Sequence, residues 1–235
     1  IILNTIVAEE LCQFADELEA ADDFGSALHT LIQRTIKEHK RIIFNGNNYA
    51  PEWVEEAEKR GLLNLKTTAD ALPSFLAEKN VQLFTKHKIF TTTELQSRYD
   101  ILMEEYCKKL HIEALTMADM AHKQILPAVS AYIHTLTTTA LDKRSLSADL
   151  SCAFETDTAA RLSGCADKMC SALVSLEENL SKAEAIQDVT ARATFYKDVL
   201  LGDMDALRQA ADEAEGLTAG EYWPFPSYTQ LLYSI

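Results

Sequence analysis

The second half of the chain carries small and apolar residues at intervals of three or four, the spacing of one face of an α-helix. Three stretches share this pattern: Leu115, Ala118, His122, Ile125, Val129, Tyr132 and Leu136; Leu162, Ala166, Met169, Leu173, Leu176, Leu180 and Ala183; and Val189, Ala193, Tyr196, Leu200, Leu207, Ala211 and Ala214. Because long helices bury such seams against one another, the pattern predicts an antiparallel three-helix bundle or coiled-coil arm. Pro127 is predicted to kink the first helix.

The composition supports the same fold class. Among 235 residues there are only 7 Gly and 5 Pro, and 47% of the residues are hydrophobic. Few helix breakers and long Ala-, Leu-, Glu- and Lys-rich stretches predict an all-α protein with a sizeable core.

The first half also shows helical patterns, interrupted by turn signals. Helices are expected over residues 4–20, 24–44, 51–61, 70–84 and 91–110. The pair Asp22 and Asp23, Pro51, and the pair Thr91 and Glu94 are typical of helix starts, whereas Gly46 and Gly61 are typical of helix ends. The positions expected to face a core are Ile6, Val7, Leu11, Phe14 and Leu18 in the first helix, and Leu28, Leu31, Ile32, Ile36 and Ile43 in the second.

The charge balance excludes some partners. With 22 basic and 36 acidic residues the net charge is −14, which argues against a nucleic-acid or anionic-membrane binder. The one basic cluster, Arg34, Lys37, Lys40 and Arg41, is interpreted as a solvated helix end that complements the helix dipole. A narrower hypothesis is that this cluster and the following Asn-Gly-Asn loop face a neighbouring subunit or a nucleotide entrance.

The cysteines and the start of the chain give expectations about the cellular compartment of the protein. The five cysteines, an odd number without any C-x-x-C motif, are interpreted as reduced core thiols of a cytoplasmic protein. No apolar run reaches membrane-spanning length and no signal-peptide pattern is present. The apolar opening Ile1-Ile2-Leu3, without an initiator Met, leads us to expect a fragment of a longer polypeptide.

No complete set of catalytic, cofactor-binding or metal-ligating residues is found. His111 and His122 lie about 20° apart around a helix but roughly 16 Å apart along it, so they cannot share an ion. Asp119 with His122 is a single Asp-x-x-His, whereas a di-metal carboxylate bundle needs Glu-x-x-His on two helices. His122 is therefore interpreted as a hydrogen-bonded core histidine, and Gly46 as a left-handed helix cap rather than part of a phosphate loop.

Eight segments, in the same order along nearly the whole chain, closely resemble the C-terminal region of type III glutamine synthetases. They are residues 4–11 (NTIVAEEL), 35–47 (TIKEHKRIIFNGN), 52–62 (EWVEEAEKRGL), 64–67 (NLKT), 79–81 (KNV), 83–88 (LFTKHK), 113–117 (EALTM) and 221–226 (EYWPFP). The resemblance is weakest between Thr137 and Gln187.

The resemblance implies a piece of a large, ring-shaped, cytoplasmic homo-oligomer of bacterial nitrogen metabolism. Such enzymes make glutamine from glutamate, ammonia and ATP, with Mg or Mn, in active sites between subunits. Their catalytic residues lie upstream of this region, so no catalytic residue is assigned here and the isolated chain is expected to be inactive. Its expected work is structural: packing on the catalytic barrel and oligomer assembly.

Three parts are expected on this basis, within one domain or several: residues 1–112 packing after the catalytic barrel, residues 113–220 forming the long bundle, and residues 221–235 forming an aromatic docking tail. The tail is expected to dock on a groove of this chain or of a neighbouring subunit. Two alternatives remain: a free-standing helical adaptor module, and a self-contained helical metalloenzyme.

Overall fold

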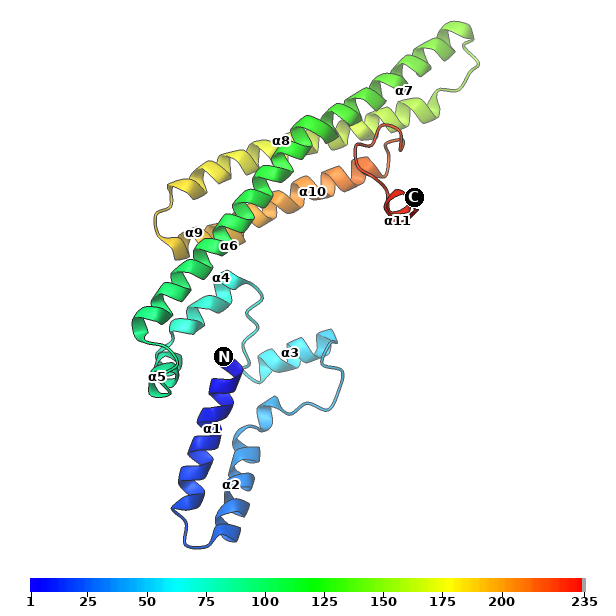
Figure 1. Ribbon diagram of the computed structural model, residues 1–235. Helices are drawn as coiled ribbons and strands as arrows, with labels where there is room; N and C mark the ends of the chain where they lie inside the picture. The colour runs from blue at the N-terminus through cyan, green and yellow to red at the C-terminus, as the bar shows by residue number, and fades with distance from the viewer. Residues whose placement is uncertain (234–235) are drawn as a thin grey trace. The chain divides into compact units, whose positions relative to one another are not determined.

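The computed structural model describes residues 1–233 and contains helices and turns, with no strand in that range (Figure 1). The predicted all-α fold class is confirmed. The chain divides into two compact units, residues 1–102 and 103–235. The division falls inside one helix, ten residues before the expected boundary at residue 112.

Unit 1 is built from short helices. These are α1 (Ile2–Glu19), α2 (Phe24–Glu38), η1 (Lys40–Ile42), α3 (Pro51–Lys59), α4 (Thr68–Ala71), η2 (Leu72–Leu76), α5 (Glu78–Lys86) and the beginning of α6 (Thr92–Met120). Its small core gathers around the buried Phe84, whose ring lies 5.8 Å from that of Phe75 and 5.5 Å from that of Phe90. Leu95 and Tyr99 on α6 are also buried.

Several predicted helix ends are confirmed by their hydrogen bonds. The Asp23 carboxylate accepts from the Ser26 amide at 3.0 Å and caps α2. The amide of Thr91 donates to the Glu94 carboxylate at 2.8 Å, and the Glu94 amide donates back to the Thr91 hydroxyl, which is the predicted capping box of α6. Gly61 has φ +73 and ends α3 in a left-handed cap.

Two predicted helices of unit 1 are wrong in extent. The helix expected over 70–84 is interrupted, because Ala77 is extended (φ −60, ψ 138) between the 3-10 turn η2 and α5. The Asn80 side chain stabilises this break by donating to the Ser74 carbonyl at 2.6 Å. The helix expected over 24–44 ends at Glu38 and is followed by the 3-10 turn η1 and an extended Ile43.

Unit 2 contains the long helices. They are the rest of α6, η3 (Ala121–Ile125), α7 (Leu126–Leu146), α8 (Ala153–Ala185), α9 (Val189–Phe195), η4 (Tyr196–Leu200), α10 (Leu201–Glu215) and the short α11 (Tyr228–Tyr233). Helix α8 runs back along α7, and α9 to α10 runs back along α8, which confirms the predicted antiparallel bundle (Figure 1). The helix expected to end at Leu110 instead continues to Met120.

Pro127 is accommodated by a change of helix type. A proline has no amide proton, so it removes one hydrogen bond from the preceding turn. Residues 121–125 form a π-helical turn, in which the amide of Leu126 reaches the carbonyl of Ala121 five residues earlier. The backbone therefore stays helical through the proline.

The seam of α8 was predicted accurately. Six of its seven expected positions are buried and Ala166 is half-buried. In the first seam two predictions are wrong: Leu115 is exposed, and the side chain of His122 is 49% exposed and pairs with Glu177 at 3.0 Å. Both lie at the margin of the apolar stripe, where the helix surface turns toward solvent.

All five cysteine thiols are free. Cys107, Cys152 and Cys165 are buried, as predicted for core thiols. Cys170 is exposed and Cys12 is half-buried, so the core prediction is wrong for Cys170. Five residues of helix rotate Cys170 by about 140° from the buried face that Cys165 occupies.

We predict that the α8 seam limits the stability of unit 2. Leu176 is 0% exposed, whereas Val174 on the same helix is 57% exposed. Leu176→Ala should lower the free energy of unfolding by about 2–5 kcal/mol through lost burial and a cavity. Val174→Ala, the matched control, should change it by less than about 0.5 kcal/mol. Denaturant unfolding followed by circular dichroism measures both, and equal effects would contradict the assignment.

Candidate assembly surface

Helix α1 is held in unit 1 through its polar side. The Glu9 carboxylate lies 2.7 Å from the ammonium of Lys86, the last residue of α5, and 2.5 Å from the ring of His87, which follows it. The Glu17 carboxylate accepts two hydrogen bonds from the Arg34 guanidinium of α2, at 2.6 and 3.0 Å. Arg34 of the basic cluster is therefore paired within unit 1.

These contacts lower the pKa of both carboxyl groups. The hydrogen bond from Lys86, with those from Gln13 and His87, lowers the pKa of Glu9 from 4.5 to about 2. The hydrogen bonds from Arg34 lower the pKa of Glu17. Both groups therefore stay ionised at neutral pH, and charge-assisted hydrogen bonds hold the polar side of α1.

The apolar side of α1 is uncovered, which corrects the predicted core stripe. Ile6, Val7 and Leu11 are 42%, 56% and 61% exposed, and only Phe14 and Leu18 are half-buried. In α2, Leu31 is buried and Leu28 half-buried, but Ile32, Ile36 and the following Ile43 are exposed. The prediction failed because amphipathicity shows that a face is apolar, not what covers it.

Two apolar grooves adjoin this face of α1. One, of about 670 Å³, is lined by Ile1, Ile2, Leu3, Phe90, Ile101 and Leu102, among others. The second, of about 390 Å³, is lined by Ile6, Leu83 and Phe84, among others. Ile2, Leu72 and Phe75 line both. Contiguous apolar surface of this kind marks an interaction site in a soluble protein.

Arg60 organises the segment that follows α2. Its guanidinium donates to the carbonyl oxygens of Arg41 (3.3 Å) and Ile43 (2.9 Å), and its Nε bonds Glu56 at 2.6 Å. Arg60 therefore supplies donors to carbonyls of the segment that follows α2, which ends at Glu38 and is followed by the short η1.

The same guanidinium lies over two aromatic rings. It is 5.9 Å from the Phe44 ring and 5.8 Å from the Trp53 ring, and these rings are 4.5 Å apart. The helix-cap interpretation of Gly46 is wrong: its φ is not positive, and an added Cβ would lie 2.7 Å from the Phe44 ring. Glycine is needed there for close approach. Lys37, Lys40 and Arg41 are exposed, and their contact with a subunit or nucleotide entrance stays a prediction.

The histidine and acidic residues weighed as ligands pair with side chains instead. Asp119 pairs with Lys123 in the next helical turn, and His111 bonds the Tyr196 hydroxyl at 3.0 Å. Within residues 1–233, no group of three or more His, Cys, Asp or Glu side chains is arranged to hold a metal ion.

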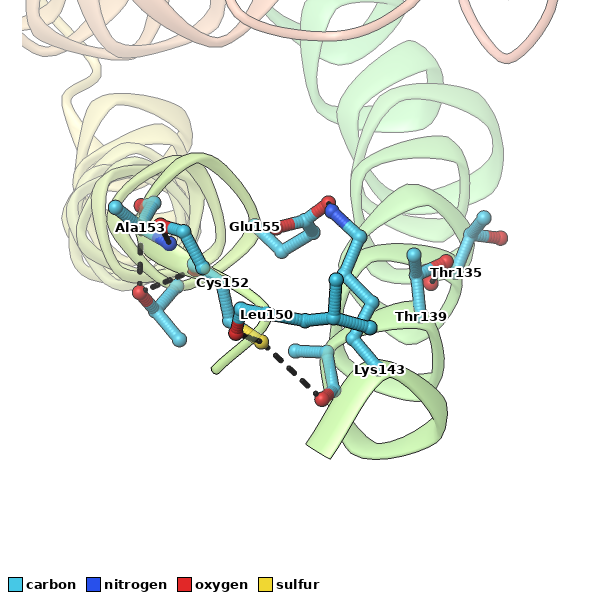
Figure 2. A network of polar contacts seen from close by, with 10 residues as sticks. Thr135, Thr139, Lys143, Leu150, Cys152, Ala153 and Glu155 are labelled. Atoms are coloured by element: carbon cyan, nitrogen blue, oxygen red, sulfur yellow. Dashed lines mark hydrogen bonds and ion pairs between the residues drawn. The ribbon is translucent and has the colours of Figure 1, made fainter. Parts of the chain in front are cut away.

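A polar network joins the ends of α7 and α8 (Figure 2). Lys143 of α7 pairs with Glu155 of α8, whose side chain is 8% exposed, and lowers the pKa of that carboxyl through a hydrogen bond. The Cys152 thiol, just before α8, lies 3.4 Å from the Ala140 carbonyl of α7. These contacts fix the turn between the two helices and carry no ligand-binding geometry of their own.

The aromatic tail docks on unit 2 of the same chain, one of the two predicted outcomes. The Tyr222 hydroxyl bonds the Thr135 hydroxyl at 2.8 Å, and its ring lies 5.1 Å from that of Tyr132. Trp223 and Phe225 wall a pocket of about 390 Å³ with residues of α6, η3 and α10. The tail beyond them differs: Tyr228, Leu231, Leu232 and Tyr233 of α11 are exposed, and residues 234–235 lie outside the described part.

No helix among the described residues is both long and apolar enough to cross a membrane. Unit 2 is a helical bundle, and unit 1 is a set of helices that leaves the apolar face of α1 uncovered. The structure therefore defines an all-helical module.

Known proteins place this module in a family. Residues 27–144, half of the chain, match the family described as the glutamine synthetase C-terminal domain, and the chain belongs to that family. It is 40% identical over 216 residues to a glutamine synthetase of Butyrivibrio fibrisolvens, covering 92% of this chain. It is 30% identical to the type-3 glutamine synthetase of Dictyostelium discoideum over 99% of this chain, and 24% identical to a glutamine synthetase of Bacteroides fragilis over 100%.

The chain spans about a third of the length of these relatives, with shares of 31%, 33% and 33%. This confirms the resemblance to type III glutamine synthetases that the sequence motifs indicated.

We predict that the Glu9 contacts make the stability of unit 1 fall in acid. A carboxyl whose pKa is lowered by folding stabilises the fold above its ordinary pKa of 4.5, and this stabilisation disappears as the pH falls toward about 2. Glu9→Gln should therefore lower the unfolding midpoint at pH 7, and the difference from wild type should vanish at the acid end. Trp53 fluorescence in a Trp223→Phe background follows unit 1, with Glu10→Gln as control. A difference independent of pH would contradict the prediction.

Proposed function

We propose that this chain is the C-terminal structural and assembly region of a type III glutamine synthetase. The full-length enzyme would make glutamine from glutamate, ammonia and ATP with Mg or Mn in the cytoplasm. Family membership and the coverage of one third of each relative support this assignment. The nucleotide and metals would bind in the remainder of the enzyme, since no residue here is assigned to them.

The uncovered apolar face of unit 1 carries the structural part of the proposal. Charge-assisted hydrogen bonds hold α1 from its polar side, and its apolar side opens into two adjoining grooves. Burying apolar area contributes about 25 cal/mol per Å², so a second surface would gain substantially by covering this face. The relatives are about three times as long as the matched region, and the remaining polypeptide is the proposed occupant.

Unit 2 has a different proposed role. Its bundle buries its own seam, and Trp223 and Phe225 of the tail pack beside α10 around a pocket of the same unit. The exposed apolar residues of α11 are the proposed contact with a neighbouring subunit of a large homo-oligomer. The alternative of a free-standing adaptor is not favoured, because the relatives over this region are glutamine synthetases.

The 235-residue chain alone is expected to make no glutamine. Purified chain is incubated with glutamate, ATP, ammonium and magnesium, and glutamine is measured over many hours. A full-length relative assayed in parallel shows that the conditions support the reaction. Sustained glutamine formation by the 235-residue chain would refute the structural assignment.

The proposed occupancy of the grooves predicts a position-dependent effect in the full-length enzyme. Ile101 lines the larger groove and is 60% exposed in this chain, whereas Leu63 lies outside both grooves and is 80% exposed. Ile101→Glu should lower the thermal unfolding midpoint of the full-length enzyme, because a buried unpaired carboxylate is costly. Leu63→Glu should leave that midpoint nearly unchanged.

The same pair of variants in the 235-residue chain separates docking from misfolding. Both side chains are exposed there, so both substitutions should leave its thermal unfolding nearly unchanged. If Ile101→Glu leaves the unfolding midpoint of the full-length enzyme unchanged, the groove does not receive the rest of the enzyme.

A further inference from the structure

Unit 2 contains a pocket beside the aromatic tail that the proposed assembly role does not use. It has a volume of about 390 Å³ and lies between the end of α6, the π-helical turn η3 and α10. Trp223 and Phe225 form the wall that the tail contributes. A volume of this size between helices is typical of a small-molecule site.

The tail wall of this pocket is fixed by its own contacts. Tyr222, the residue before Trp223, bonds the Thr135 hydroxyl at 2.8 Å, and its ring lies 5.1 Å from that of Tyr132. The Trp223 and Phe225 rings meet edge to face with their centres 6.2 Å apart. The wall is therefore formed before any ligand arrives, and a ligand would not have to order it.

The helices contribute small side chains at the pocket. Ala121 of η3 and Ala211 of α10 both line it, and they are 1% and 9% exposed. Alanine leaves space there that a larger apolar side chain would fill. Ala121 also begins the π-helical turn, and single π-turns within helices are frequent at functional sites.

The apolar lining suits an aromatic ring. Met117 and Met120 are half-buried and line the pocket together with Trp223 and Phe225. Thioether side chains adapt to the shape of a ligand and make favourable contacts with rings. Aromatic side chains prefer to pack against a further ring, offset or edge to face.

The charged residues of the lining favour a cation. Arg208, Asp212 and Glu215 are exposed and line the pocket. The Arg208 Nε donates to both oxygens of the Asp212 carboxylate at 3.1 Å, so these two charges compensate each other. Glu215 forms no ion pair among residues 1–233. One negative charge is therefore left for a ligand, and a cation near the Trp223 ring is also attracted by the face of that ring.

We propose that this pocket binds a small organic cation with one aromatic ring and an ammonium group on a short linker. The ring would lie among Met120, Trp223 and Phe225, and the ammonium group would face Glu215. All of these residues belong to unit 2, and the proposal does not depend on the enzyme class assigned above.

The test follows the fluorescence of Trp223 in the 235-residue chain carrying Trp53→Phe, which leaves Trp223 as its one tryptophan. The probes 2-phenylethylammonium, 2-phenylethanol and 3-phenylpropionate share a ring and differ in charge, and each is titrated at constant ionic strength. The cation should change the emission saturably at millimolar concentrations. The alcohol should bind about two- to five-fold more weakly, the size of an exposed charge pair, and the anion should bind most weakly. Butylammonium, which has no ring, should give no saturable change.

Two variants should change the affinity for the cation in opposite directions. Glu215→Gln should lower it to the affinity for 2-phenylethanol and leave the alcohol unaffected. Arg208→Gln should raise it and weaken 3-phenylpropionate, because the Asp212 carboxylate loses its partner. Both side chains are exposed, so both variants should keep the fold. Asp205→Asn, an exposed carboxylate of α10 outside the lining, is the matched control and should leave all affinities unchanged.

The absence of a saturable change with 2-phenylethylammonium in the Trp53→Phe chain would overturn the proposal, whatever the other variants do. Equal affinities for the three ring-bearing probes would overturn it too, because Glu215 would then play no part. A saturable change with butylammonium at the same concentrations would show that the ring is not recognised, and would also overturn it.

Discussion

The burial of the α8 seam between α7 and α10 is the interaction on which unit 2 depends. Six of the seven seam positions are buried, and α8 contacts both neighbours along its length. The polar features of this unit follow from that packing. The Lys143 and Glu155 pair fixes the turn into α8, and Trp223 and Phe225 of the aromatic tail pack beside α10 around a pocket.

Unit 1 is stabilised differently from unit 2. Its helices are short, its core is small, and α1 is held by ion pairs of Glu9 and Glu17 together with the half-buried Phe14 and Leu18, while the rest of its apolar stripe is exposed. Individual surface ion pairs contribute little, typically about 0–1 kcal/mol. Unit 1 therefore keeps an apolar face available for another surface, which is the property expected of a region that works as part of a larger enzyme.

Sequence periodicity predicted the bundle well and unit 1 less well. The α8 seam was predictable because a long apolar stripe of constant spacing is stabilised by burial between neighbouring helices. The conformation after α2 was not predictable, because its carbonyls at Arg41 and Ile43 are bonded by Arg60, which lies 19 and 17 residues further along the chain. The role of Gly46 was missed for the same reason: the Phe44 ring occupies the space of its missing side chain. The exposure of Ile6 and Leu11 was not predictable either, because an apolar helical pattern does not indicate which surface covers it.

By itself, the sequence determined the all-helical class, the three long helices, the caps at Asp23, Thr91 and Gly61, and the relationship to type III glutamine synthetases. These features depend on local helix propensity, on periodicity and on the order of motifs, which are all properties of the sequence itself. Tertiary structure alone decided which apolar stripes are covered, the conformation after α2, and that Trp223 and Phe225 wall a pocket beside Met120 and Glu215. Those outcomes depend on contacts between distant residues, and burial is a property of such contacts.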